Sequence, residues 1–153
     1  MNPAPLGVFD SGIGGLTVAR ALFERLPREA VIYFGDTARV PYGPKSPDTV
    51  RRYAAEILAY LLRRGVKALV VACNTITAQA LEYLRERSPV PLVGVIEPGA
   101  RAAVQATKTG KIGVIGTAGT IASGAYERAI TAARPDATVY ARACPLLDRK
   151  SVV

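Results

Sequence analysis

The chain has 153 residues, the size of one ordinary domain, and half of them are hydrophobic while 21% are charged. This composition allows a buried core and excludes disordered and low-complexity classes of protein. The net charge is +8, but the basic residues come as separated pairs such as Arg51–Arg52, without an aromatic stacking platform, so we expect no nucleic-acid partner.

Strands and helices are expected to alternate along the whole chain. Short apolar runs rich in β-branched residues indicate strands, and apolar residues at helical spacing indicate the helices between them. Ser46 and Pro47 suit the N-cap and the first position of a helix, and Gly65 suits its C-terminal end. In chain order we predict strand 6–9, helix 16–26, strand 31–34, helix 47–64, strand 68–72, helix 76–87, strand 92–96, helix 98–107, strand 111–115, helix 121–133 and strand 138–141.

This alternation predicts an α/β fold, a mostly parallel sheet with helices on both faces. We expect a first α/β domain over residues 1–96, which contains Cys73, and an incomplete second α/β domain over residues 97–153. In sheets of this kind, ligands bind beyond the carboxyl ends of the strands. The residues that follow each strand are therefore the candidates for a functional site.

The turn that follows the first strand is rich in glycine and could be mistaken for a nucleotide loop. A dinucleotide fingerprint needs G-x-G-x-x-G, but counting from Gly12 the sixth position is Thr17. Asp10 would also place a carboxylate beside a pyrophosphate, which is repulsive. A tight turn, or a loop that lets a small anion approach backbone N–H groups, fits the sequence better.

Cys73 closes an apolar strand and opens the next helix, so it is the leading candidate for a reactive group. The N-terminus of a helix lowers the pKa of a thiol and favours the thiolate. A buried cysteine of the core is the alternative, but the polar residues Asn74 and Thr75 that follow are unusual at a core position. Asp10, at the end of a neighbouring strand, could accept a proton from Cys73 and would raise the pKa of the thiol.

Several classes of chemistry and of location are not expected for this chain. There is no His, so neither Ser-His nor Cys-His catalysis can come from these residues alone. The second cysteine, Cys144, precedes Pro145 and is interpreted as a core residue. The chain has no basic and apolar leader, so we expect a cytoplasmic protein, in which the two cysteines are free thiols. It has no apolar run of about 18 residues, so we expect no membrane partner.

Five motifs in order resemble those of glutamate racemases, and the resemblance runs from about Leu6 to Leu147. The opening motif spans residues 10–16, and the second, Gly-Asp-Thr-Ala-Arg-Val-Pro-Tyr-Gly, spans residues 35–43. Ala-Cys-Asn-Thr at residues 72–75 is similar to the family's first catalytic-cysteine motif. The stretches at residues 97–100 and 116–120 also fit.

The resemblance implies a cofactor-independent enzyme that interconverts L- and D-glutamate for peptidoglycan synthesis, without a metal. Cys73 would be one of two thiols that flank the α-carbon of glutamate, and Asp10 would assist it. Asp10 and its neighbours would also bind the substrate. The implied substrate-binding residues are Asp10, Ser11, Tyr42, Gly43, Asn74 and Thr75, with Thr117 or Thr120 as further candidates.

The chain departs from the family near its end. The family's second thiol lies in a Cys-Thr-His motif that this chain lacks, and residues 148–153 form an atypical tail. We therefore expect a truncated chain that is inactive alone as a racemase. The alternatives are a catalytically silent module that binds a dicarboxylate or a protein, or an aspartate racemase, and a homodimer remains open.

Overall fold

The computed structural model describes residues 3–145, and the atypical tail at 148–153 lies outside the described residues. These residues form twelve helices and strands. In chain order they are β1 (Leu6–Asp10), α1 (Leu16–Arg25), β2 (Val31–Gly35), α2 (Pro47–Arg63), β3 (Ala68–Val71), α3 (Asn74–Arg85), β4 (Leu92–Gly94), α4 (Ile96–Ala106), β5 (Lys111–Gly116), α5 (Ala118–Ala122), α6 (Ala125–Ala133) and β6 (Thr138–Ala143).

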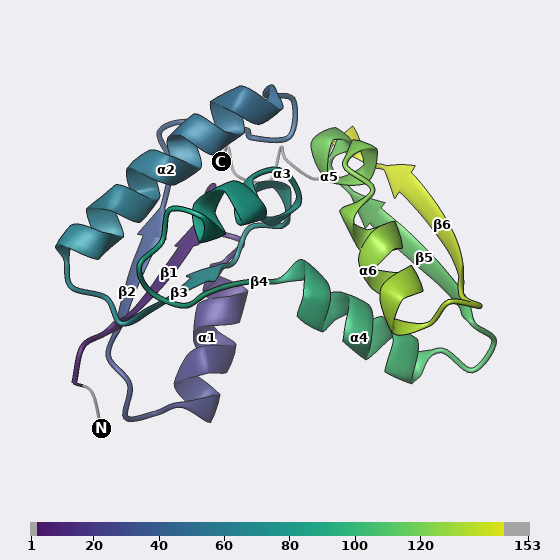
Figure 1. The fold of residues 1–153 in the computed structure, drawn as a ribbon, viewed down its shortest axis with the longest axis horizontal. Coiled ribbons are helices and arrows are strands. Elements are labelled where there is room, and N and C mark those ends of the chain that lie inside the picture. The colour runs from purple at the N-terminus through teal and green to yellow at the C-terminus, as the bar shows by residue number, and fades with distance from the viewer. Residues whose placement is uncertain (1–2, 146–153) are drawn as a thin grey trace.

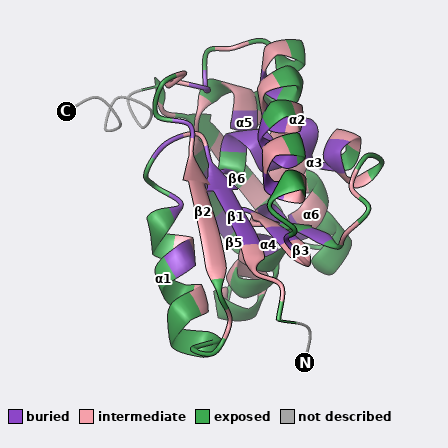
Figure 2. Ribbon diagram, turned by 90° about the vertical axis from the view of Figure 1, so that its left-hand side faces the viewer, coloured by how far each residue is buried: buried purple, intermediate pink, exposed green. Residues whose placement is uncertain are grey.

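The first four strands form one parallel sheet in the order β2-β1-β3-β4. Helix α1 lies on one face of this sheet, and α2 and α3 lie on the other (Figure 2). Strands β5 and β6 form a second, two-stranded parallel sheet, against which α4 and α6 pack (Figure 1). The predicted α/β fold class is confirmed.

The main core lies between the first sheet and the helices α2 and α3. Residues at alternate positions of the strands point into it, as the two-residue period of a strand requires. Its fully buried members include Phe9 of β1, Val71 of β3 and Ile57 of α2. A smaller core beneath α4 and α6 consists of Ala100, Ile112, Val114 and Ile130.

The chain passes from the first sheet to the second through β4 and α4, and α4 begins at Ile96. A domain boundary at residues 96/97, in the sense of two units that fold independently, stays a prediction. The outer face of the second sheet is uncovered in the described residues: Ile115 is 68% exposed and Tyr140 is 60% exposed. No helix in residues 3–145 is long and apolar enough to cross a membrane.

Several predicted ends are shifted: the strand expected at residues 92–96 ends at Gly94, and α4 and α3 each begin two residues earlier than expected. One predicted helix differs more. The stretch expected as a single helix at residues 121–133 is two helices, α5 and α6, because Gly124 between them has a left-handed backbone with φ of 65°. Helix α5 also begins earlier than expected, since the side chain of Thr117 caps it by accepting a hydrogen bond from the N–H of Thr120 at 3.3 Å. Ser46 and Pro47 open α2 as predicted.

Candidate active site

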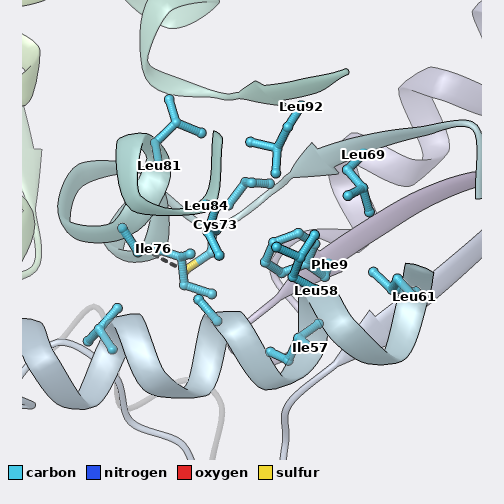
Figure 3. Close-up of a cluster of buried hydrophobic side chains, with 14 of the residues drawn as sticks. Phe9, Ile57, Leu58, Leu61, Leu69, Cys73, Ile76, Leu81, Leu84 and Leu92 are labelled. Carbon is cyan, nitrogen blue, oxygen red and sulfur yellow. Dashed lines mark hydrogen bonds between the residues drawn. The ribbon is translucent and has the colours of Figure 1, made fainter. Parts of the chain in front are cut away.

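Cys73 is the N-cap of α3, at the carboxyl edge of the first sheet. Its side chain accepts a hydrogen bond from the N–H of Ile76 at 3.5 Å, in the way that a serine or aspartate caps a helix. Only 5% of the residue is exposed, and Figure 3 shows its sulfur among the apolar side chains of the main core. The thiol is therefore at the border between the core and the sheet edge.

Ser11 stands between Cys73 and Asp10. The Oγ atom of Ser11 lies 3.3 Å from the Sγ atom of Cys73 and donates a hydrogen bond to Oδ1 of Asp10 at 3.5 Å. The other carboxylate oxygen of Asp10 accepts the N–H of Gly15 at 2.8 Å, which closes the glycine turn over the carboxylate. The structure thus brings Asp10, Ser11 and Cys73 together, with Ser11 as the bridge.

The thiol of Cys73 has a raised pKa, which corrects the expectation from the helix N-terminus. Burial raises it most, the charge of Asp10 raises it further, and hydrogen bonds from Ser11 and Ile76 oppose the change, so that the pKa is about 11. The helix terminus does supply a donor to the sulfur, but the loss of water around a buried thiolate outweighs it. Cys73 is consequently a neutral thiol at neutral pH.

Asn74 and Thr75 open α3 and face the second sheet. The hydroxyl of Thr75 lies 3.0 Å from that of Thr117, which in turn lies 2.9 Å from the hydroxyl of Thr120. The hydroxyl of Tyr126 on α6 donates to Oδ1 of Asn74 at 2.7 Å. These bonds place the start of α3 against α5 and α6, so the polar residues of the two sheets meet at one place.

Gly43 joins this arrangement through its backbone, whereas the side chain of Tyr42 does not. A β-carbon on Gly119 would lie 3.3 Å from the carbonyl oxygen of Gly43, so the second motif reaches the start of α5. Tyr42 is fully buried, and its hydroxyl donates to Asp36. Its side chain therefore stabilises the loop from within and presents no exposed surface to a ligand.

The carboxylate that holds this loop was not assigned a role from the sequence. Asp36 is 5% exposed and accepts hydrogen bonds from Tyr42 and from Nε of Arg39, the latter at 2.6 Å. Arg39 also pairs with Glu56 on α2 and stacks over the ring of Tyr53, 4.2 Å from its centroid. An acidic residue directly after a strand, with Arg three positions later, is the sequence signal that could have suggested this ion pair.

Cys144 is not a core residue, contrary to its interpretation from the sequence. It follows β6, it is partly exposed, and its N–H donates to the carbonyl of Gly116 at 2.8 Å. Both cysteines are free thiols. Within residues 3–145, no group of three or more His, Cys, Asp and Glu side chains could hold a metal ion.

Cys144 is expected to react faster than Cys73 with iodoacetamide at pH 7. A pKa of about 11 instead of the ordinary 9.0 leaves about a hundredfold less thiolate on Cys73 at this pH, and burial also hinders the reagent. Peptide mass spectrometry of a labelling time course measures both rates, and labelling in urea is the control. Faster labelling of Cys73 in the folded chain would contradict the buried, neutral thiol.

A separate groove of about 890 Å³ lies between α3, α4 and α6. Its lining includes small side chains of α6 such as Ala129, together with the charged Arg128 and Glu82. None of the predicted site residues lines it. The chemistry-bearing groups are gathered at the sheet edges, so we place the candidate site there and not in this groove.

The chain is similar to known proteins over nearly its full length. A model of the family Asp/Glu/hydantoin racemase matches residues 7–151. A glutamate racemase of Geobacter metallireducens is 58% identical over 141 residues, which are 92% of this chain and 52% of the relative. A glutamate racemase of Corynebacterium diphtheriae is 59% identical over 145 residues, which are 95% of this chain and 54% of the relative. The chain thus spans about half the length of the curated relatives it matches.

Solved structures of glutamate racemases are also similar to this chain. The glutamate racemase isoform RacE1 from Bacillus anthracis superimposes with a TM-score of 0.93 at 48% identity, over 96% of this chain and 55% of the other. A glutamate racemase from Francisella tularensis in complex with D-glutamate superimposes with a TM-score of 0.88 at 42% identity, over 95% of this chain and 55% of the other. The fold of residues 3–145 is therefore that of about half of these proteins.

Proposed function

Since the chain belongs to the Asp/Glu/hydantoin racemase family, we propose that its site handles the α-proton of glutamate on one face, as one half of a glutamate racemase. The observation that carries the proposal is the contact of the Cys73 thiol with Ser11 beside the carboxylate of Asp10. A thiolate at this position would remove the α-proton, and Asp10 would take the proton of the thiol. Neither step requires a cofactor.

The raised pKa of Cys73 suits a base for this reaction. The α-proton of an amino acid is a very weak acid, so a thiolate with a conjugate acid of pKa about 11 is a stronger base for it than an ordinary thiolate. The cost is a low population of that thiolate at neutral pH. A carboxylate close enough to accept the thiol proton offsets this cost, because the site then never carries two negative charges.

The polar groups around Cys73 are suited to a dianionic amino acid. We propose that Ser11, the backbone of Tyr42 and Gly43, and the side chains of Asn74 and Thr75 hold the carboxylates and amino group. The N-terminus of α3 favours a carboxylate at this place. The hydroxyls of Thr117 and Thr120 add donors from the second sheet. The Francisella relative was crystallised with D-glutamate, which supports glutamate as the substrate class.

Racemisation itself needs an acid and a base on opposite faces of the planar intermediate. Cys73 serves one face, and a thiol that removes a proton and returns it to the same face restores the starting enantiomer. Cys144 does not stand in the family's second-cysteine motif, so we propose no role for it on the other face. The proposed setting is the cytoplasm, where D-glutamate would enter peptidoglycan synthesis, and the homodimer stays a prediction.

The test is to incubate the chain with L- and D-glutamate separately in D2O. We expect deuterium at the α-carbon of one enantiomer, seen by NMR, with no inversion by chiral chromatography and no exchange in the Cys73→Ala variant. Aspartate in place of glutamate tests the aspartate racemase alternative. Binding of glutamate without exchange would instead make the chain a silent dicarboxylate-binding module, and inversion by the wild-type chain would show that a second acid is present.

A further inference from the structure

The position of Ser11 carries an inference beyond substrate binding. Its hydroxyl is the one group that contacts both the thiol of Cys73, at 3.3 Å, and the carboxylate of Asp10, at 3.5 Å, among the hydrogen bonds of residues 3–145. Asp10 and Cys73 do not bond each other directly in this part of the chain. Ser11 therefore offers a path by which a proton can pass between them within the protein.

The donors and acceptors around the three residues allow an arrangement in which their two protons point the same way. Oδ2 of Asp10 is occupied by the N–H of Gly15, so Oδ1 remains for the hydroxyl of Ser11. The sulfur of Cys73 already accepts the N–H of Ile76. With a neutral thiol, the S–H bond can point to Oγ of Ser11 while the O–H bond of Ser11 points to Asp10. The two protons then lie in a row.

We propose that Ser11 is the proton-carrying link between Cys73 and Asp10. The S–H bond of Cys73 breaks as its proton joins Oγ of Ser11, and the O–H bond of Ser11 breaks as that proton joins Oδ1 of Asp10. The products are a thiolate and a neutral carboxylic acid, so the total charge stays at minus one and no other reactant is needed. This link rests on the proposed function, because it supplies the base that the reaction uses.

The other titratable groups near Cys73 and Asp10 already take part in hydrogen bonds or ion pairs. Tyr33 of β2 donates its hydroxyl to the carbonyl of Gly12 at 3.1 Å, and Tyr42 donates to Asp36. Burial raises the pKa of both tyrosines, so both remain neutral across the physiological range. The charge of Asp36 is paired with Arg39. A proton that leaves Cys73 inside the site therefore has Asp10 as its acceptor.

The link makes a prediction about equilibrium that needs no substrate. While Asp10 is ionised, the hydroxyl of Ser11 donates to it and cannot donate to a thiolate. In an Asp10→Asn variant the amide oxygen is needed by the N–H of Gly15, which turns the amide NH2 group toward Ser11. The hydroxyl then accepts from the amide and is free to donate to the thiolate, so the pKa of Cys73 falls by more than the loss of charge alone would cause.

The experiment is a double-mutant cycle on the pKa of Cys73, measured from thiolate absorbance or iodoacetamide rates against pH in a Cys144→Ala background. Asp10→Asn is introduced into three chains: wild type, Ser11→Ala and Ser11→Thr. We expect Asp10→Asn to increase the thiolate-to-thiol ratio of Cys73 about tenfold more in wild type and Ser11→Thr than in Ser11→Ala. This factor corresponds to the free energy of a hydrogen bond to a charged group. Threonine keeps the hydroxyl and is the matched control.

Equal shifts in all three chains would overturn the link, and so would a Ser11→Thr chain that behaves like Ser11→Ala. Circular dichroism checks that each variant is folded, and Ser11→Gly replaces Ser11→Ala if the latter is not. Because no glutamate is used, a chain that fails to exchange the α-proton leaves this result intact and removes only the proposed function. A non-additive cycle with rescue by threonine supports the link.

Discussion

Replacing Phe9 with alanine is expected to lower the free energy of unfolding by about 4 kcal/mol, a large part of the 5–15 kcal/mol that a domain of this size has. Phe9 is fully buried in β1, and on either side of it Phe34 of β2 and Val71 of β3 are its register partners. Truncation removes apolar contact with the core and leaves a cavity that the central strand cannot close by moving, because both of its neighbours hold it.

Phe23→Ala is the matched control, since it removes the same atoms from α1, where the ring is 52% exposed. We expect a loss of about 1 kcal/mol or less for this variant. Urea unfolding followed by circular dichroism gives both values. Similar losses for Phe9 and Phe23 would mean that the first sheet does not carry the main core.

Gly35→Ala is expected to cost about 3 kcal/mol and to loosen the candidate site. A β-carbon on Gly35, at the end of β2, would lie 2.3 Å from the carbonyl oxygen of Gly12, which is backbone and cannot rotate away. The strand end and the glycine turn would have to separate. Because Gly12 follows Ser11, the bridge to Cys73 would open, so we also expect iodoacetamide to reach Cys73 faster than in wild type.

Gly113→Ala tests whether the addition of a methyl group to a strand glycine is enough to explain the loss. Gly113 lies in β5, and no heavy atom would come within 4 Å of its β-carbon. We expect its stability to stay within about 0.5 kcal/mol of wild type, or to rise slightly through the stiffer unfolded chain. Urea unfolding and labelling of Cys73 are measured on both variants. An equal loss in the two would contradict the steric cause.

The order of strands and helices could be predicted from the sequence because each element has its own local pattern. Short apolar runs and helical spacing do not depend on distant contacts, so β1 and α2 were predicted within one residue of their observed ends. The break at Gly124 was missed because a glycine inside a helical pattern does not reveal the sign of its φ angle. Only the three-dimensional path of the chain decides that sign.

The candidate site was predictable to the extent that it follows strand ends. Asp10, Ser11 and Cys73 meet because β1 and β3 are neighbours in a parallel sheet, so their carboxyl ends coincide. The sequence shows two opposing influences on the pKa of Cys73, the helix terminus and Asp10, but not the burial that raises it most. The buried hydroxyl of Tyr42 likewise depends on Asp36, a contact that forms only in the folded loop.

Polar side chains of the two sheets contact each other at the candidate site, as Thr75 and Thr117 do. In residues 3–145 the backbone crosses between the sheets at one place, the short step from Gly94 to Ile96. A small rotation there changes the spacing of Thr75 and Thr117 more than any spacing within either sheet. A ligand held by both hydroxyls would favour one placement of the two sheets, and by linkage a chain already held in that placement would bind it more tightly. Affinity at this site would then depend in part on how the two sheets are held relative to each other.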